Sequence, residues 1–306
     1  MPLKNLPEFL RKSKTVKRNI YPERIDSVFY PLVIFRERDS FPATGRVIIS
    51  DIDKTYLNTD FESLKGLMWI PLEVAVDKVT IDRMNLVYQA LRHGRGDQPV
   101  LTPFVFVTAS PPFLFSPLSD KMLRDGVEYD VIAMKDQPAL FKRFEFDQLR
   151  SQVTFKLFAL FEILRLMDGK RHSLILFGDD TESDLQIYLL FKKIVEEKPR
   201  MFRVADLLLE NGVSLKYMEK LLKLIREFYT MNVSIKVDYI FIYLSKGEFL
   251  PGGVYPPVVE YTSSSQVAIF LFEKKLINRY YLEKIVSPES EEYFLATEWL
   301  RDYGYL

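Results

Sequence analysis

The chain has 306 residues, of which 48% are hydrophobic, so it can bury a substantial core as one large domain or two small ones. Lys and Arg total 42, and Asp and Glu also total 42, so the overall charge gives no attraction to nucleic acid and no such partner is expected. The chain contains no cysteine and 2 histidines, which excludes disulfides and cysteine nucleophiles and argues against a multi-histidine metal site.

Residues 1–43 are expected to form an N-terminal arm. They lack the long apolar stretch of a signal peptide, and no run of about 18 apolar residues occurs along the chain, so we expect a cytoplasmic protein. An apolar helical face followed by basic residues would allow a peripheral membrane contact; this face comprises Leu3, Leu6, Phe9 and Leu10. An arm that packs on its own domain or stays mobile is the alternative.

Residues 44–306 are expected to form one domain. Short apolar runs that end in small or polar residues predict buried parallel strands at residues 45–53, 100–110, 171–180 and 235–247. Apolar residues at helical spacing predict helices over residues 82–91 and 150–170. The alternation of strands and helices predicts an α/β fold with a doubly wound, mostly parallel sheet.

Two further segments bear on access to this sheet. Tyr56 to Pro103 is too short for a large cap domain, so we expect an open crevice, which favours a substrate presented on something larger, such as a lipid headgroup. Residues 196–234 are expected to be a helical insertion whose apolar face comprises Leu215, Met218, Leu221, Leu222 and Ile225. The insertion either packs on the sheet or caps the crevice and contacts a membrane or partner.

Three of the predicted strands end in acids or hydroxyls. These residues are Asp51 and Asp53, Thr108 and Ser110, and Asp179 and Asp180. Ligands of doubly wound sheets bind beyond the carboxyl ends of the strands, so the three strand ends should meet at one crevice. Asp51 and Asp53 would repel each other unless a cation or a shared proton held both in place. Acids that cap a loop are the structural alternative.

Two other residues have competing interpretations. Ser110 precedes Pro111 and Pro112, a pattern typical of a helix N-cap, and such a helix start would also aim backbone amides at an anion. Lys156 lies in the otherwise apolar helical stretch "TFKLFALFEIL", where a lone lysine reaches toward solvent unless an acid pairs with it.

The motifs "DIDKT", "VFVTAS", "TFKLF" and "FGDDTESD" resemble, in order, the four motifs of the haloacid dehalogenase superfamily. The longer stretches around them are similar to the catalytic domain of actin-patch-type phosphatidate phosphatases, and the similarity extends from Thr44 to Tyr188. The chain departs from that pattern at Lys54, Ala109 and Pro112, which leaves the chemistry intact but bears on the lipid substrate.

The resemblance implies a role for each motif residue. Asp51 would be the nucleophile that forms an aspartyl-phosphate, and Asp53 the general acid and base. Thr108 and Ser110 would bind the phosphoryl group, and Lys156 would neutralise it. Mg²⁺ is the implied cofactor, because carboxylate oxygens suit it. Its ligands would come from Asp51, Asp179 and the position of Asp53, with Asp180 or Asp184 in a supporting role.

The sequence therefore predicts a Mg²⁺-dependent phosphomonoester hydrolase that acts on phosphatidate or a related lipid phosphate. A soluble phosphatase for sugar or nucleotide phosphates is one alternative, and a binding module that retains the fold without turnover is another. The chain has no GxxxxGK[ST] phosphate loop, and no GxGxxG follows a strand.

Overall fold

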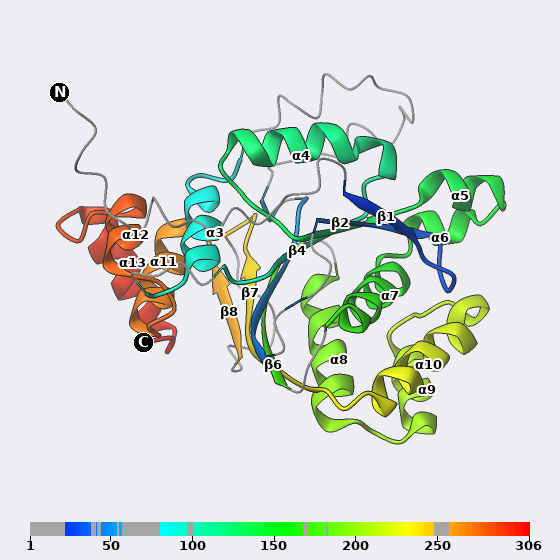
Figure 1. Cartoon of the computed structure of the whole chain (residues 1–306). Coiled ribbons are helices and arrows are strands. Elements are labelled where there is room, and N and C mark those ends of the chain that lie inside the picture. The colour runs from blue at the N-terminus through cyan, green and yellow to red at the C-terminus, as the bar shows by residue number, and fades with distance from the viewer. Residues whose placement is uncertain are drawn as a thin grey trace.

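The computed structural model describes residues 22–37, 41, 44–53, 55–56, 80–96, 101–167, 171–181, 183–247 and 257–306. These residues form a mixed α/β structure around an eight-stranded sheet with the order β1-β2-β5-β4-β3-β6-β7-β8 (Figure 1). The strands are β1 (Glu23–Asp26), β2 (Leu32–Arg36), β3 (Thr44–Asp51), β4 (Phe104–Thr108), β5 (Val131–Lys135), β6 (Arg171–Asp179), β7 (Ser234–Tyr243) and β8 (Val258–Tyr261).

The sheet is mostly parallel, as the sequence predicts. Neighbouring strands in the run β5-β4-β3-β6-β7-β8 are all parallel. In contrast, β2 runs antiparallel to both of its neighbours, β1 and β5. The chain adds β4 and β5 on one side of β3 and then continues with β6, β7 and β8 on the other. The strand order thus reverses at β3, which is where parallel sheets of this kind form a ligand crevice.

Helices cover both faces of the sheet (Figure 1). The described helices are α3 (Met84–His93), α4 (Phe115–Arg124), α5 (Gln137–Lys142), α6 (Phe146–Arg150), α7 (Gln152–Arg165), α8 (Asp184–Glu197), α9 (Met201–Glu210), α10 (Leu215–Thr230), α11 (Ser264–Glu273), α12 (Arg279–Ile285) and α13 (Glu291–Asp302), with a short 3-10 helix η2 (Pro112–Leu114). None of them is long and apolar enough to cross a membrane.

Alternate residues of the strands pack into two separate hydrophobic cores, one on each face of the sheet. Val47 and Ile49 of β3 join the core under α7, α8, α9 and α10, whereas Ile48 joins the core under α3, α4, α11 and α13. This alternation follows from the two-residue period of a strand, and it explains why the strand sequences are apolar throughout: both faces are buried.

The four predicted strands correspond to β3, β4, β6 and β7, and the two predicted helices to α3 and α7. The sequence does not predict β1, β2, β5 or β8. β1 and β2 lie within the segment assigned to the N-terminal arm and extend the sheet next to β5. Leu3, Leu6, Phe9 and Leu10 lie outside the described residues, and the division into an arm and a domain stays a prediction.

The predicted insertion contains α9 and α10, which pack against the first of the two cores. Its predicted apolar face is wrong in one respect, because Leu215 at the start of α10 is 75% exposed whereas Leu221 and Ile225 are buried. Tyr217, Leu224 and Phe228 complete the buried face instead.

Candidate functional site

Three adjacent strands bring the predicted site residues to one edge of the sheet. Asp51 ends β3, Thr108 ends β4 and Asp179 ends β6, and β3 lies between the other two strands. All three side chains are buried, with residue exposures of 1%, 0% and 0%. The convergence expected from the sequence is therefore present in the structure.

Lys156 reaches this edge from the second turn of α7. Its Nζ atom donates a hydrogen bond to Asp51 Oδ2 at 3.0 Å and also pairs with Asp184 Oδ1. Lys156 is 1% exposed, so the interpretation of a lysine that reaches toward solvent is wrong. A buried ammonium is stable there because two carboxylates surround it.

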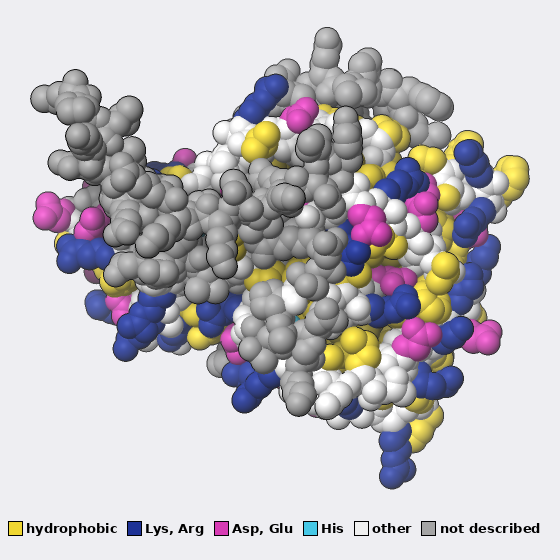
Figure 2. Space-filling model, in the orientation of Figure 1, with side chains coloured by type: hydrophobic (Ala, Val, Ile, Leu, Met, Phe, Trp, Pro, Cys, Tyr) yellow, Lys and Arg dark blue, Asp and Glu magenta, His cyan; other side chains and the backbone are white. Residues whose placement is uncertain are grey.

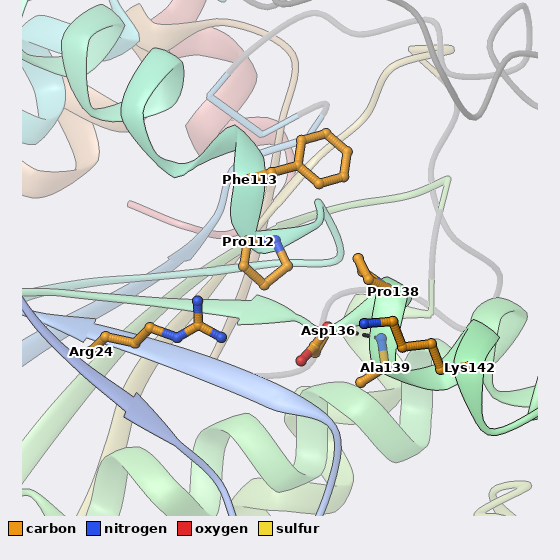
Figure 3. Close-up of a pocket in the computed structure, with 7 residues that line it drawn as sticks. All are labelled: Arg24, Pro112, Phe113, Asp136, Pro138, Ala139 and Lys142. Carbon is orange, nitrogen blue, oxygen red and sulfur yellow. Dashed lines mark hydrogen bonds between the residues drawn. The ribbon is translucent and has the colours of Figure 1, made fainter.

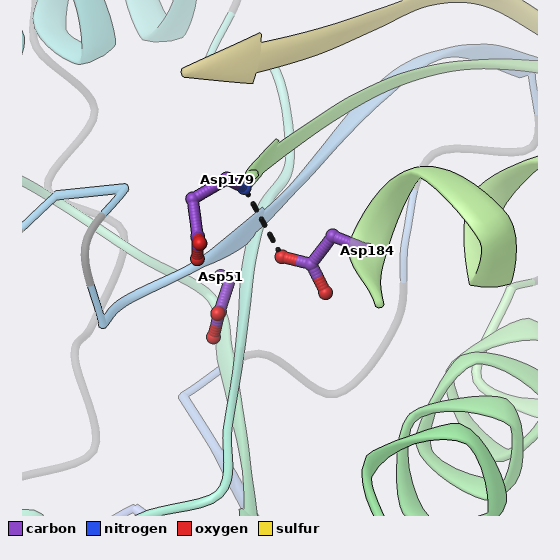
Figure 4. Close-up of side chains that lie close together, drawn as sticks. All are labelled: Asp51, Asp179 and Asp184. Carbon is purple, nitrogen blue, oxygen red and sulfur yellow. Dashed lines mark hydrogen bonds between the residues drawn. The ribbon is translucent and has the colours of Figure 1, made fainter. Parts of the chain in front are cut away.

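Asp51, Asp179 and Asp184 form a buried cluster of carboxylates (Figure 4). One carboxylate oxygen of each of these three residues lies within 4.8 Å of the corresponding oxygens of the other two. Asp184 is the first residue of α8, and a Cβ atom added at Gly178 would lie 2.6 Å from its side chain. The absence of a side chain at Gly178 therefore lets Asp184 approach the end of β6.

Charge within this cluster is uneven. Lys156 supplies one positive charge against the three carboxylates, so two negative charges are in excess if all three acids are ionised. Burial raises the pKa of Asp179 to about 6, and the charge of Asp184 adds to this shift. A hydrogen bond from Thr181 and the charge of Lys156 act in the opposite direction. A proton or a cation would lower the electrostatic cost of the cluster.

Asp53 is held by the two hydroxyls that the sequence singles out at the end of β4 and in the loop after it. Thr108 Oγ1 donates to Asp53 Oδ2 at 3.1 Å, and Ser110 Oγ donates to the same oxygen at 3.4 Å. The backbone N–H of Ser110 donates to Thr108 Oγ1 at 3.0 Å. Asp53 is 8% exposed. Its hydrogen bonds to Thr108 and Ser110 connect the loop after β3 to the end of β4 and the loop that follows.

Ser110 is not a helix N-cap, so that prediction is wrong. The helix that follows is the short η2, which begins at Pro112 and has Pro111 at its N-cap position without a side-chain cap. The extended backbone of Pro111 delays the helix start, because proline disfavours helical geometry in the residue before it. The Ser110 hydroxyl is thereby available to Asp53.

Asp180 lies apart from the carboxylate cluster. Its Oδ1 atom accepts hydrogen bonds from the backbone N–H of Ser245 at 3.1 Å and from Ser245 Oγ at 2.7 Å, so the side chain is directed to the loop after β7. Of the two acids that the sequence leaves as alternatives, the structure thus brings Asp184 to Asp51 and Asp179.

Two tyrosines and a serine support the site, and the sequence does not identify them. Ser50 Oγ donates to the Asp51 carbonyl at 2.7 Å and lies 2.6 Å from the hydroxyl of Tyr88 on α3. Tyr188 Oη on α8 donates to the Phe177 carbonyl at 2.9 Å and fastens α8 to β6. Burial raises the pKa of both tyrosines, so they stay protonated donors. The apolar spacing of 82–91 indicates that Tyr88 is buried, but no local pattern identifies its partner.

Residues 46–208, just over half of the chain, match the family model described as phosphatidate phosphatase APP1, catalytic domain. The match includes all four quoted motifs and every residue of the cluster, and it confirms the resemblance found in the sequence. No curated protein matches the chain, and neither does any solved structure.

Proposed function

The chain belongs to the family of phosphatidate phosphatase APP1 catalytic domains, and on this premise we propose that it is a Mg²⁺-dependent phosphatase of the haloacid dehalogenase type. Its substrate would be phosphatidate or a related phosphomonoester. The observation that carries the proposal is the buried Lys156, which pairs with both Asp51 and Asp184 beside Asp179. Phosphoryl transfer requires a positioned nucleophile and positive charge close to the transferred group, and Lys156 at Asp51 would supply both.

The donor set suits Mg²⁺. Asp51, Asp179 and Asp184 offer hard carboxylate oxygens, and their excess negative charge calls for a divalent cation. We propose that these three acids hold the ion, together with the backbone carbonyl of Asp53. Once bound, Mg²⁺ would supply positive charge to the phosphoryl oxygens.

Asp51 is the proposed nucleophile. The backbone N–H of Ile52 donates to its Oδ1 at 2.8 Å and Lys156 to its Oδ2 at 3.0 Å, so the carboxylate is held in one orientation. Attack on phosphorus would form an aspartyl-phosphate and release the alcohol. Lys156, already at the attacking carboxylate, would offset negative charge that develops on the phosphoryl group.

Asp53 is the proposed general acid and base. It would protonate the leaving oxygen and then take a proton from the water that hydrolyses the aspartyl-phosphate. Thr108 and Ser110 hold its carboxyl from one side, and both lie at the end of β4, where we propose that they also bind the phosphoryl group. The hydroxyls would thus align the acid with the substrate oxygen it serves.

Several finer features belong to the same proposal. We propose a doubly wound HAD-like Rossmannoid fold without a large cap domain, with residues 1–43 as an arm and residues 196–234 as a helical insertion. An open crevice of that kind would accept a phosphate displayed on a lipid surface. We also propose a cytoplasmic protein in peripheral contact with membranes and without a nucleic-acid partner.

The test is phosphate release from phosphatidate in mixed micelles and from a soluble phosphomonoester, with Mg²⁺ or with a chelator. The proposal expects metal-dependent release that Asp51→Asn abolishes and Asp120→Asn, at an exposed acid on α4, leaves intact. Preference for soluble sugar or nucleotide phosphates would favour the alternative phosphatase. Mg²⁺ binding without release from any phosphomonoester would favour a non-catalytic binding module.

A further inference from the structure

Three phenylalanines are exposed together at the turn between α5 and α6. Phe141, Phe144 and Phe146, which we call the phenylalanine surface, are 47%, 80% and 50% exposed. The ring of Phe146 lies edge-on to the other two, with centroids 5.6 Å from Phe141 and 6.3 Å from Phe144. Clustered exposed aromatic rings are unusual on a free surface and typically mark a contact site.

The turn that carries these rings is well braced. Phe144 has a φ of 56°, a left-handed conformation that is unfavourable for a bulky residue. Backbone N–H groups of Phe144 and Glu145 donate to Phe141 and Leu140 carbonyls, both at 3.0 Å. Glu145 in turn accepts a hydrogen bond from Tyr217 and pairs with Lys216 at 3.0 Å. The protein thus holds Phe144 outward at some conformational cost.

The phenylalanine surface is connected to the proposed active site at both ends. Gln137 at the start of α5 donates to the carbonyl of Ala109, next to Thr108, at 2.6 Å. Lys135 Nζ donates at 3.0 Å to the carbonyls of Leu149 and Ser151, where α6 ends and α7 begins, and α7 carries Lys156. The segment from α5 to α6 therefore lies between the loop after β4, next to Thr108, and the start of α7, which carries Lys156.

A pocket of about 340 Å³ lies at the α5 end of this surface (Figure 3). Pro112 and Phe113 line one side, and Pro138 and Lys142 line the other. Phe113 is 60% exposed and follows the β4 loop that holds Ser110. Apolar surface is thus present between the phenylalanine surface and the loop at the site.

Exposed basic side chains belong to the same segment as the rings. Lys142, Arg143 and Arg150 are exposed in the same segment, and Figure 2 shows hydrophobic and basic side chains, with some acidic ones between them, over α5 and α6. Asp147 is the exposed acid among them, whereas Glu145 is buried and paired. Exposed aromatic rings beside basic groups are complementary to an anionic lipid interface, where rings enter the acyl boundary and cations meet the headgroups.

We propose that the phenylalanine surface docks on an anionic lipid membrane and holds the crevice at the interface. The inference that docking serves turnover rests on the proposed phosphatase function, whereas docking itself does not require catalysis. A membrane is favoured over a protein partner by the combination of protruding rings and flanking basic residues. The orientation would bring the β4 loop, with Thr108 and Ser110, toward lipid headgroups.

The test is co-sedimentation of the full chain with vesicles of phosphatidylcholine and phosphatidylserine. The double variant Phe144→Ser with Phe146→Ser should bind these vesicles about tenfold more weakly or worse, because two interfacial rings are lost. Phe202→Ser is the matched control, since Phe202 on α9 is 66% exposed outside the surface. Replacing Lys142 and Arg143 by Gln should weaken binding about fivefold for each charge and flatten its dependence on salt.

Two further measurements separate this proposal from the catalytic one. Asp51→Asn should bind vesicles as the wild type does, so loss of catalysis leaves the docking test intact. The double variant should hydrolyse a soluble phosphomonoester at the wild-type rate, which also establishes that it folds, and should lose turnover of phosphatidate in vesicles. Phe144→Ser alone serves if the double variant does not fold.

Equal vesicle binding by the wild type and the double variant would overturn the proposal, and so would an equal loss in Phe202→Ser. A wild type that does not bind vesicles would overturn it as well. If sedimentation velocity shows a wild-type dimer that the double variant dissociates, the surface contacts a second copy of the chain instead of a membrane.

Discussion

Two buried ionic groups in this protein differ in their balance of charge. Arg92 on α3 and Asp130 before β5 form a buried pair of one cation and one anion, with Arg92 Nη2 3.0 Å from Asp130 Oδ1, and the partly exposed Glu128 lies 3.9 Å from Arg92 Nε. Asp130 also accepts a hydrogen bond from the backbone N–H of Phe104 at 2.8 Å, and Arg92 donates to the carbonyl of Thr102 at 2.7 Å. In contrast, Lys156 stands beside the three carboxylates of Asp51, Asp179 and Asp184.

The difference indicates what each group does. The balanced pair joins α3 to the strand β4 and the loop before β5, and its charges need no further ion. The carboxylate cluster concentrates excess negative charge at the ends of β3 and β6, where it destabilises the metal-free fold unless a proton or cation binds. A protein retains such an imbalance where a ligand completes the site, so the two groups should respond differently to substitution.

The largest effect is expected from Lys156→Met. Removing this ammonium takes away the cation that contacts the proposed nucleophile, so kcat/KM for phosphatidate should fall about 10³-fold or more. Arg92→Met is the control, because it removes a buried cation outside the cluster. If turnover per folded molecule falls equally in both variants, the carboxylate cluster and the Arg92–Asp130 pair do not differ in their role in catalysis.

Asp130→Asn should reverse this pattern and reduce stability more than activity. The buried guanidinium would lose its buried charge partner and keep only the partly exposed Glu128 at 3.9 Å, and we expect the free energy of unfolding to fall by about 3 kcal/mol. Chemical denaturation measures this change, and calorimetric Mg²⁺ titration of the folded variant should give the wild-type affinity. Weaker Mg²⁺ binding in Asp130→Asn would mean that the pair and the cluster are not separate.

Asp184→Asn and Asp180→Asn form a matched pair of substitutions near the end of β6. Loss of Asp184 should weaken Mg²⁺ binding about 10–100-fold, because its carboxylate belongs to the cluster. Loss of Asp180 should change the affinity less than about threefold, because that side chain bonds to Ser245. The reverse order of effects, measured by calorimetry, would contradict the assignment of Asp184.

The smallest effect concerns pH. The pKa of Asp179 is raised from 3.8 to about 6, so its proton must leave before a metal ion binds, and the apparent Mg²⁺ affinity should fall as the pH drops below about 6. A raised acid pKa stabilises the fold at low pH, and this contribution is lost as the pH rises through about 6. Thermal melts with and without Mg²⁺ should therefore diverge above that pH, whereas parallel melts from pH 4 to 8 would be inconsistent with this titration.

Much of the central fold could be predicted because it is encoded locally. The strands β3, β4, β6 and β7 are continuous apolar runs that end in polar residues, and parallel strands buried on both faces require such sequences. β1 is not predictable from its sequence "ERID", which is polar and largely exposed at the sheet edge. β8 is a run of only four residues, "VVEY", and β2 owes its position to an antiparallel pairing that no local pattern encodes.

The site residues were predictable to the extent that they end strands. Asp51, Thr108 and Asp179 follow apolar runs, and a parallel sheet brings such ends together. The residues that contact these strand ends from helices are not predictable in this way. Whether Asp180 or Asp184 faces the cluster depends on the turn into α8, and the support of Ser50 by Tyr88 joins residues from β3 and α3 that sequence spacing alone cannot pair.

The central claim, that Asp51 is the nucleophile of a metal-dependent phosphatase, is tested most directly by isolating the covalent intermediate. The protein would be mixed with radiolabelled phosphatidate and Mg²⁺, quenched in acid during turnover and digested for peptide mapping. The account predicts an acid-stable, hydroxylamine-sensitive phosphate on the peptide that contains Asp51, absent from Asp51→Asn and absent without the metal. Turnover without a phosphorylated peptide, or with phosphate on another residue, would contradict it.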